Sequence, residues 1–145
     1  MVIMTHYFNK TQNLDLIKAI ATAEKMTSGE IRVHIQSNCK EDVFNEAKKV
    51  FHRLKMYKTK ERNGILIFIA LKSKRFAILG DKGIHEKVRD NFWNETRDIM
   101  LEEFKKDKVK EGIIQAVHNI GEKLKKYFPI KTNDRNELPN TISEK

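Results

Sequence analysis

The spacing of hydrophobic residues changes several times along this chain, and each change predicts a different secondary-structure element. Apolar residues recur at helical spacing over residues 11–26 and then alternate strictly over 30–36, with Ile31, Val33 and Ile35 on one face. A second helical stripe runs from 42 to 54, and unbroken apolar runs follow at 65–71 and 76–79. This order predicts helix, strand, helix and a β-hairpin whose first strand is buried on both faces.

Helical spacing returns after residue 84 and continues to the last apolar stripe. One long helix or two consecutive helices are predicted up to residue 104, with a break near Asp90 and Asn91, and a final helix over 113–128 is stopped by Pro129. A strand, a helix and a strand in succession predict a right-handed βαβ crossover with parallel strands. The predicted fold class is α/β, a three-layer α/β/α sandwich with a small mixed sheet and a central β-hairpin.

Length and composition indicate one domain. The chain has 145 residues, of which 39% are hydrophobic and 34% charged, as in ordinary globular proteins. We assign residues 1–130 to the domain and 131–145 to a polar C-terminal tail. Cys39 is the only cysteine, so an internal disulfide is excluded. No apolar run approaches the roughly 20 residues that cross a bilayer, and no secretory signal precedes the domain, so the expected location is cytoplasmic.

The net charge of +9 favours anionic partners, but basic and acidic residues are mostly interleaved along the chain. Two basic runs stand out, at residues 72–75 and 105–110. Neither is interleaved with aromatic residues on which bases could stack, so nucleic-acid binding is the least favoured reading.

Several polar residues flank the predicted strands at one common rim of the sheet. Because hairpin strands are antiparallel, Gly80 and Asp81 should return beside Arg62 and Asn63. The βαβ crossover brings the start of the first strand to the same rim, where Glu30 stands.

Oxygen donors at that rim predict a site for a hard divalent cation, Ca²⁺ or Mg²⁺, rather than zinc. Glycine at the end of the hairpin would let the backbone approach a ligand closely. Arg62 is the candidate for holding the phosphate of a ligand. The predicted metal ligands are Asp81, Asn63, Glu30 and Gly80, together with Glu24 from the end of the first helix.

Each of these residues also has a purely structural interpretation. Asp81 precedes a helix and fits an N-cap, while Arg62 fits a salt bridge with Asp81 or Glu30. Glu30 fits a solvated charge at a strand start, and Asn63 fits a turn. The sequence leaves these alternatives open.

Familiar catalytic motifs are missing from the sequence. A cysteine phosphatase needs an arginine six positions after its nucleophile, and Asn45 stands at that distance from Cys39. The chain has no phosphate-binding loop ending in Gly-Lys-Ser/Thr, no Gly-x-Ser-x-Gly elbow and no Cys-x-x-Cys pair. A water activated by a metal ion at the rim is the remaining route to hydrolysis.

Four short motifs in this order resemble the TPM domain family: SGEIRV at 28–33, MYKT at 56–59, RNGILI at 62–67 and GDKGI at 80–84. That family is named for a thylakoid lumen phosphatase, a photosystem II repair protein and a modulator of an acetylcholine receptor. The similarity covers residues 14–128. It implies an α/β/α sandwich, a divalent metal, often calcium, at the rim, and an acid phosphatase activity.

The resemblance assigns the metal or phosphate role to Asn63 and Asp81, with Glu30 and Arg62 as neighbours. Many relatives carry a signal peptide and a membrane anchor, and neither is found here, which favours a stand-alone bacterial type. The leading hypothesis is a TPM module that binds a divalent cation and has a protein partner. The alternatives are a metal-dependent acid phosphatase and, less favoured, an electrostatic nucleic-acid binder.

Overall fold

A computed structural model of the chain describes residues 7–130 and 142–144. In chain order its elements are α1 (Lys10–Glu24), β1 (Glu30–Gln36), α2 (Val43–Arg53), β2 (Gly64–Ala70), β3 (Arg75–Gly80), α3 (Lys82–His85), the 3₁₀ helix η1 (Asp90–Trp93), α4 (Asn94–Lys105), α5 (Val109–Leu124) and β4 (Ile142–Glu144). The predicted break near Asp90 is confirmed, because a 3₁₀ turn separates α3 from α4.

The four strands form one mixed sheet in the order β3-β2-β1-β4. β1 runs parallel to β2, as the βαβ prediction requires, and β2 pairs antiparallel with β3 in the predicted hairpin. All seven residues of β2 are buried, which confirms that this strand is covered on both faces. The apolar run of β2 is unbroken because apolar cores cover both of its faces, whereas β1 alternates because an apolar core covers only one of its faces.

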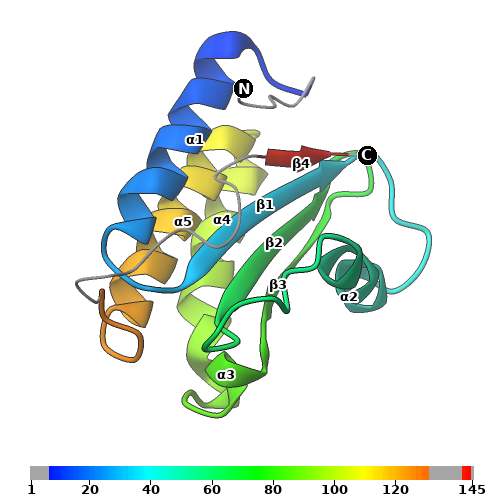
Figure 1. Cartoon of the computed structure of the whole chain (residues 1–145). Coiled ribbons are helices and arrows are strands. Elements are labelled where there is room, and N and C mark those ends of the chain that lie inside the picture. The colour runs from blue at the N-terminus through cyan, green and yellow to red at the C-terminus, as the bar shows by residue number, and fades with distance from the viewer. Residues whose placement is uncertain (1–6, 131–141, 145) are drawn as a thin grey trace.

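Helices cover both faces of the sheet and complete the predicted α/β/α sandwich (Figure 1). Helices α1, α4 and α5 form one layer, whose core includes Leu16 and Ile120 against Ile31 and Ile67. Helix α2 forms the other layer, where Val50 and other apolar side chains pack against alternate residues of the hairpin. The alternation along β2 therefore directs successive side chains into two different cores, whereas β1 contributes apolar side chains only to the core under α1, α4 and α5.

Capping side chains position the helices that begin next to loops. Asn9 and Gln12 form a reciprocal capping box at the start of α1, and Asp42 caps α2 by accepting from the backbone N–H of Asn45. No helix in the described ranges is long and apolar enough to cross a membrane.

The strand β4 is the one element of the sheet that the sequence did not predict. It lies parallel to β1, with Ile142 opposite Val33, and Ile142 is buried in the core. The hydroxyl of Ser143 is hydrogen-bonded to Nδ1 of His34 at 3.0 Å. Part of the predicted polar tail is thus an edge strand, while residues 131–141 and 145 lie outside the described residues.

Candidate functional site at the sheet rim

Three separate segments meet at the rim where β1 and β2 begin and β3 ends, at the lower end of the sheet in Figure 1. Glu30 is in register with Gly64, and Ile65 is in register with Gly80. The backbone N–H of Glu30 donates to the carbonyl of Asn63 at 3.3 Å, and that of Asp81 donates to the carbonyl of Gly64 at 2.9 Å. The convergence predicted from the hairpin and the crossover is confirmed.

Arg62 and Asp81 form a two-pronged ion pair at this rim. The Nε atom of Arg62 donates to Oδ2 of Asp81 at 2.7 Å, and Nη2 donates to Oδ1 at 3.0 Å. The hydrogen bonds and charge of Asp81 raise the pKa of the Arg62 guanidinium. Oδ1 also accepts from the backbone N–H of Lys82 at 2.8 Å, so Asp81 is the N-cap of α3. Both structural interpretations of this pair are therefore confirmed.

Glycine at position 83 makes the geometry of the Arg62–Asp81 pair possible. The N–H of Gly83 donates to the carbonyl of Arg62 at 2.9 Å. A Cβ atom at position 83 would lie 2.0 Å from the carbonyl oxygen of Glu61. Gly80 serves packing instead, because a Cβ there would meet side-chain carbons of Ile84 and Trp93 at 3.2 and 3.3 Å.

Asn63 is buried and links the loops that precede β1 and β2. Its Nδ2 donates to Oγ of Ser28 at 3.3 Å, and that hydroxyl donates to Oε2 of Glu61 at 2.9 Å. The backbone N–H of Asn63 donates to Oγ1 of Thr59 at 3.2 Å. The sequence analysis did not assign Ser28, Thr59 and Glu61 to the site, because polar residues in loops have no periodicity. Ser28 and Thr59 do lie in two of the family motifs, which is the signal that could have marked them.

Glu24 and Glu30 place two carboxyl groups against each other in a buried setting. Glu24 ends α1 and Glu30 begins β1, and their residues are only 8% and 3% exposed. Oε2 of Glu24 accepts from the backbone N–H of Ile31 at 3.0 Å, whereas Oε1 has no hydrogen-bond donor among the described residues. The expectation of a solvated Glu30 is therefore wrong, because the fold closes over the start of β1.

Burial sets the protonation state of this carboxyl pair. Desolvation is the main cause that raises the pKa of Glu24 from 4.5 to about 9, and the hydrogen bond and negative charge of Glu30 act in the same direction. The backbone N–H of Ile31 opposes this rise, since it stabilises the carboxylate. At neutral pH these causes favour the protonated form of Glu24.

The rim thus contains two separate pairs of side chains, an ion pair and a carboxyl pair, rather than one cluster of ligands. The first joins Asp81 to Arg62, and the second joins Glu24 to Glu30. Over residues 7–130 and 142–144, no group of three or more His, Cys, Asp or Glu side chains is placed to hold a metal ion. The metal roles assigned from sequence stay predictions.

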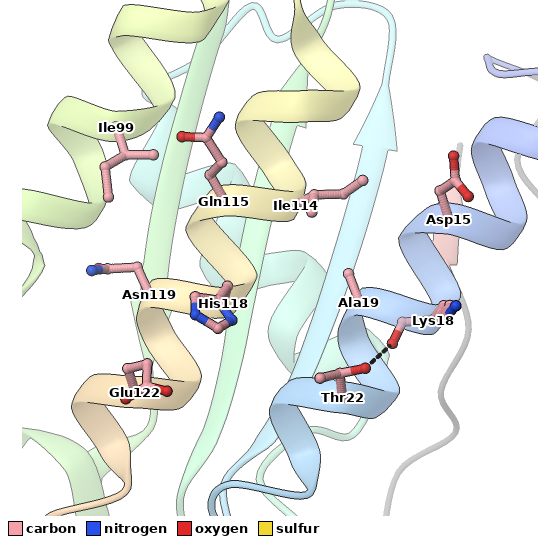
Figure 2. A pocket seen from close by; sticks show the side chains of 10 residues that line it. All are labelled: Asp15, Lys18, Ala19, Thr22, Ile99, Ile114, Gln115, His118, Asn119 and Glu122. Atoms are coloured by element: carbon pink, nitrogen blue, oxygen red, sulfur yellow. Dashed lines mark hydrogen bonds between the residues drawn. The ribbon is translucent and has the colours of Figure 1, made fainter.

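A separate groove lies away from the rim, on the layer of helices (Figure 2). Its volume is about 690 Å³, and its walls come from α1, α4 and α5. Thr22 and Ala19 line it from α1, and His118 and Glu122 line it from α5. The sequence did not point to this groove, because the residues of one helix face contain no recognisable motif.

Comparisons with known proteins agree with the motifs found in the sequence. A family model described as TPM domain matches residues 1–123. The chain is also similar to the NMR structure of the BA42 protein from the psychrophilic bacterium Bizionia argentinensis, with 44% sequence identity and a TM-score of 0.92. That alignment covers 100% of both chains. No curated protein matches this chain.

Proposed function

The chain belongs to the TPM domain family, and from that premise we propose that it binds a divalent cation, Ca²⁺ or Mg²⁺, at the buried carboxyl pair of Glu24 and Glu30. The observation that carries this proposal is the pair itself. Two carboxyl groups in contact and out of water cannot both ionise without a compensating positive charge. Either a proton or a cation can supply that charge.

The donor set determines which cation is expected. Carboxylate oxygens are hard ligands, which favour Ca²⁺ and Mg²⁺ over softer transition metals. Oε1 of Glu24, which has no donor among the described residues, offers an oxygen that a cation would coordinate. Because only two carboxylates are available, waters would complete the shell, and we expect weak affinity, on the order of 10⁻⁴ to 10⁻³ M.

Asp81 is less suited to this role than the sequence motif indicates. Its oxygens already accept hydrogen bonds from Arg62 and from the backbone of Lys82. A cation bound to Asp81 would have to displace the guanidinium group, which is itself a cation. We therefore assign the metal to the carboxyl pair, where Oε1 of Glu24 has no hydrogen-bond donor among the described residues.

No observation favours the phosphatase alternative in the same way. Arg62, the candidate for holding a phosphate, uses Nε and Nη2 on Asp81. Turnover of a phosphate ester would depend on a water activated by the bound cation. Phosphatase activity, a protein partner and a cytoplasmic location remain predictions from the sequence.

A calcium titration followed by backbone amide chemical shifts tests the proposal. We expect saturable shifts at residues 24–31 and much smaller ones at 80–84. The variant Glu24→Gln keeps the shape of the side chain and removes its ability to ionise when a cation binds, so it should abolish the response. Asp81→Asn is the matched control at the same rim and should leave the response in place.

The proposal is wrong if millimolar calcium and magnesium both leave residues 24–31 unshifted in the wild-type protein. It is also wrong if Glu24→Gln binds calcium as well as the wild-type protein does. A parallel assay with an aryl phosphate and metal tests the phosphatase alternative. Turnover that survives in Glu24→Gln would separate catalysis from the carboxyl pair.

A further inference from the structure

Two basic segments that are distant in the sequence meet around one hollow at the end of the sheet opposite the rim. The hollow lies where β2 turns into β3 and where α4 passes into α5, and its volume is about 450 Å³. Lys74 and Arg75 line it from the hairpin, and Lys105 lines it from the end of α4. The fold thus joins the two basic runs of the sequence into one surface.

The centre of this hollow is apolar. Phe76 of β3 and Phe104 of α4 both line it and pack edge to face, with ring centroids 5.5 Å apart and an angle of 79°. Leu101 lines it as well and is 42% exposed, so its side chain is accessible to a ligand. Gly112 of α5 makes room for Phe104, because a Cβ at position 112 would lie 2.8 Å from its ring. The volume lies within the range of roughly 300 to 1,000 Å³ that is common for pockets that bind small molecules, and the wall combines these apolar side chains with polar and charged ones.

The basic groups around the hollow are not neutralised by the rest of the protein. Lys74 and Lys105 form no ion pair with any residue in the described ranges. Arg75 donates to the backbone carbonyl of Glu41 at 3.4 Å, a contact that leaves its charge uncompensated. Asp107 is the one acidic residue on the lining, so the lining carries a positive excess.

Neighbouring charges do not cancel that excess. The carboxylates of Glu102 and Glu103 lie 3.8 and 3.9 Å from the ammonium of Lys106, so these three residues together keep one negative charge, which is smaller than the positive excess of the lining. Lys74 has a φ of 54°, a left-handed conformation that favours glycine or asparagine.

We propose that this hollow binds a free single-chain amphiphile with a carboxylate headgroup, of the fatty-acid class. The acyl chain would cover Phe76, Phe104 and Leu101, and the carboxylate would meet Lys74, Arg75 and Lys105. The net charge of +9 raises the local concentration of such an anion. This site is independent of the carboxyl pair at the rim.

The shape and chemistry of the hollow favour this ligand over larger anions. A flat membrane surface would not fill a concave site. A single nucleic-acid strand needs open ring faces for stacking, whereas Phe76 and Phe104 pack against each other. An acidic peptide would bring backbone polar groups against an apolar surface, and leaving them unpaired there costs free energy.

Decanoate is a suitable probe, used below its micellar concentration with ¹⁵N-labelled full-length protein. We expect saturable amide shifts at residues 74–76 and 101–105. Decyltrimethylammonium has the same chain and the opposite charge, and butyrate has the same headgroup and a short chain. Each should bind at least roughly tenfold more weakly, because one loses charge-assisted contacts and the other loses apolar burial.

Charge reversal provides the matched test in the protein. Lys74→Glu and Lys105→Glu should each weaken decanoate binding roughly tenfold. Lys18→Glu makes the same change in charge at an exposed residue of the other groove, shown in Figure 2, and should leave the affinity within about twofold. Leu101→Asn, at an exposed position that should tolerate the change, should also weaken binding.

Three results would overturn the proposal. In the first, decanoate shifts residues along α1 and α5 instead of the hairpin and α4. In the second, decyltrimethylammonium binds as tightly as decanoate, which would indicate adsorption without charge recognition. In the third, vesicles of anionic lipid or single-stranded DNA bind at this surface while monomeric decanoate does not.

Discussion

The ion pair of Arg62 and Asp81 and the carboxyl pair of Glu24 and Glu30 show how differently the carboxyl groups at the rim can be neutralised. Asp81 faces the guanidinium group of Arg62 and the N-terminus of α3, so its negative charge is matched by donors. Glu24 faces another carboxyl group, and its pKa is raised to about 9. The first pair fixes the loop to the sheet, while burial and the neighbouring carboxyl group favour a proton on the second, and in our proposal a cation replaces that proton. Acid residues at one rim therefore differ in function according to the partner that the fold supplies.

The substitution Gly83→Ala should break the first pair without touching the second, and at neutral pH it has the largest expected effect of any single substitution on stability. Its Cβ would lie 2.0 Å from the carbonyl oxygen of Glu61, so the backbone that carries Arg62 must move. We expect a loss of about 3 kcal/mol in the free energy of unfolding, measured by urea denaturation. Gly80→Ala is the control and should cost about 1 kcal/mol, because side-chain ends can yield. Equal costs for both variants would contradict this account.

The pH dependence of stability should distinguish the second pair. A carboxyl group whose pKa is raised by folding binds its proton more tightly in the folded state, so it favours folding at low pH. The free energy of unfolding should fall as the pH rises from about 4.5 to about 9, by at most about 1.4 kcal/mol per pH unit. Glu24→Gln should remove this slope, as seen in urea denaturation across that range.

Glu122→Gln provides the control for this pH experiment, because Glu122 is an exposed glutamate of α5. It should follow the wild-type slope. If Glu24→Gln shows the same slope as the wild-type protein, Glu24 does not carry the buried proton.

Calcium should stabilise the protein through the second pair alone. At ten times its dissociation constant, a ligand specific for the folded state adds about 1.4 kcal/mol to the free energy of unfolding. Because the cation replaces a proton, its apparent affinity should increase as the pH rises. Urea denaturation with calcium and with a chelator measures both effects. No calcium response at pH 9 would contradict the assignment.

The smallest effect separates the two structural roles of Asp81. Asparagine is as good an N-cap as aspartate, so Asp81→Asn removes the charge and keeps the cap, whereas Asp81→Ala removes both. The free energy of unfolding of Asp81→Ala should therefore be about 1 kcal/mol lower than that of Asp81→Asn. The difference between wild type and Asp81→Asn should shrink as salt screens the ion pair. If Asp81→Asn abolishes the calcium response, calcium binds at Asp81 and the assignment to Glu24 and Glu30 is wrong.

Most of the fold could be predicted from the spacing of hydrophobic residues along the chain. The alternation at 30–36 and the apolar run at 65–71 correspond to β1 and β2, and their order along the chain required the parallel pairing. The same reasoning placed Arg62 and Asp81 at one rim, because antiparallel strands return to their starting point. β4 was not predictable, since three residues are too few to show a period and its pairing depends on β1 alone.

The sequence by itself determined the elements, their order and the set of polar residues that reach the rim, because these follow from local periodicity and strand direction. Only the tertiary structure decided that Asp81 meets Arg62 and that Glu24 meets Glu30. Likewise, only the folded chain brings Lys74 and Lys105 around one hollow. Side-chain pairing depends on distances of a few ångströms between segments remote in sequence, and no local pattern encodes them.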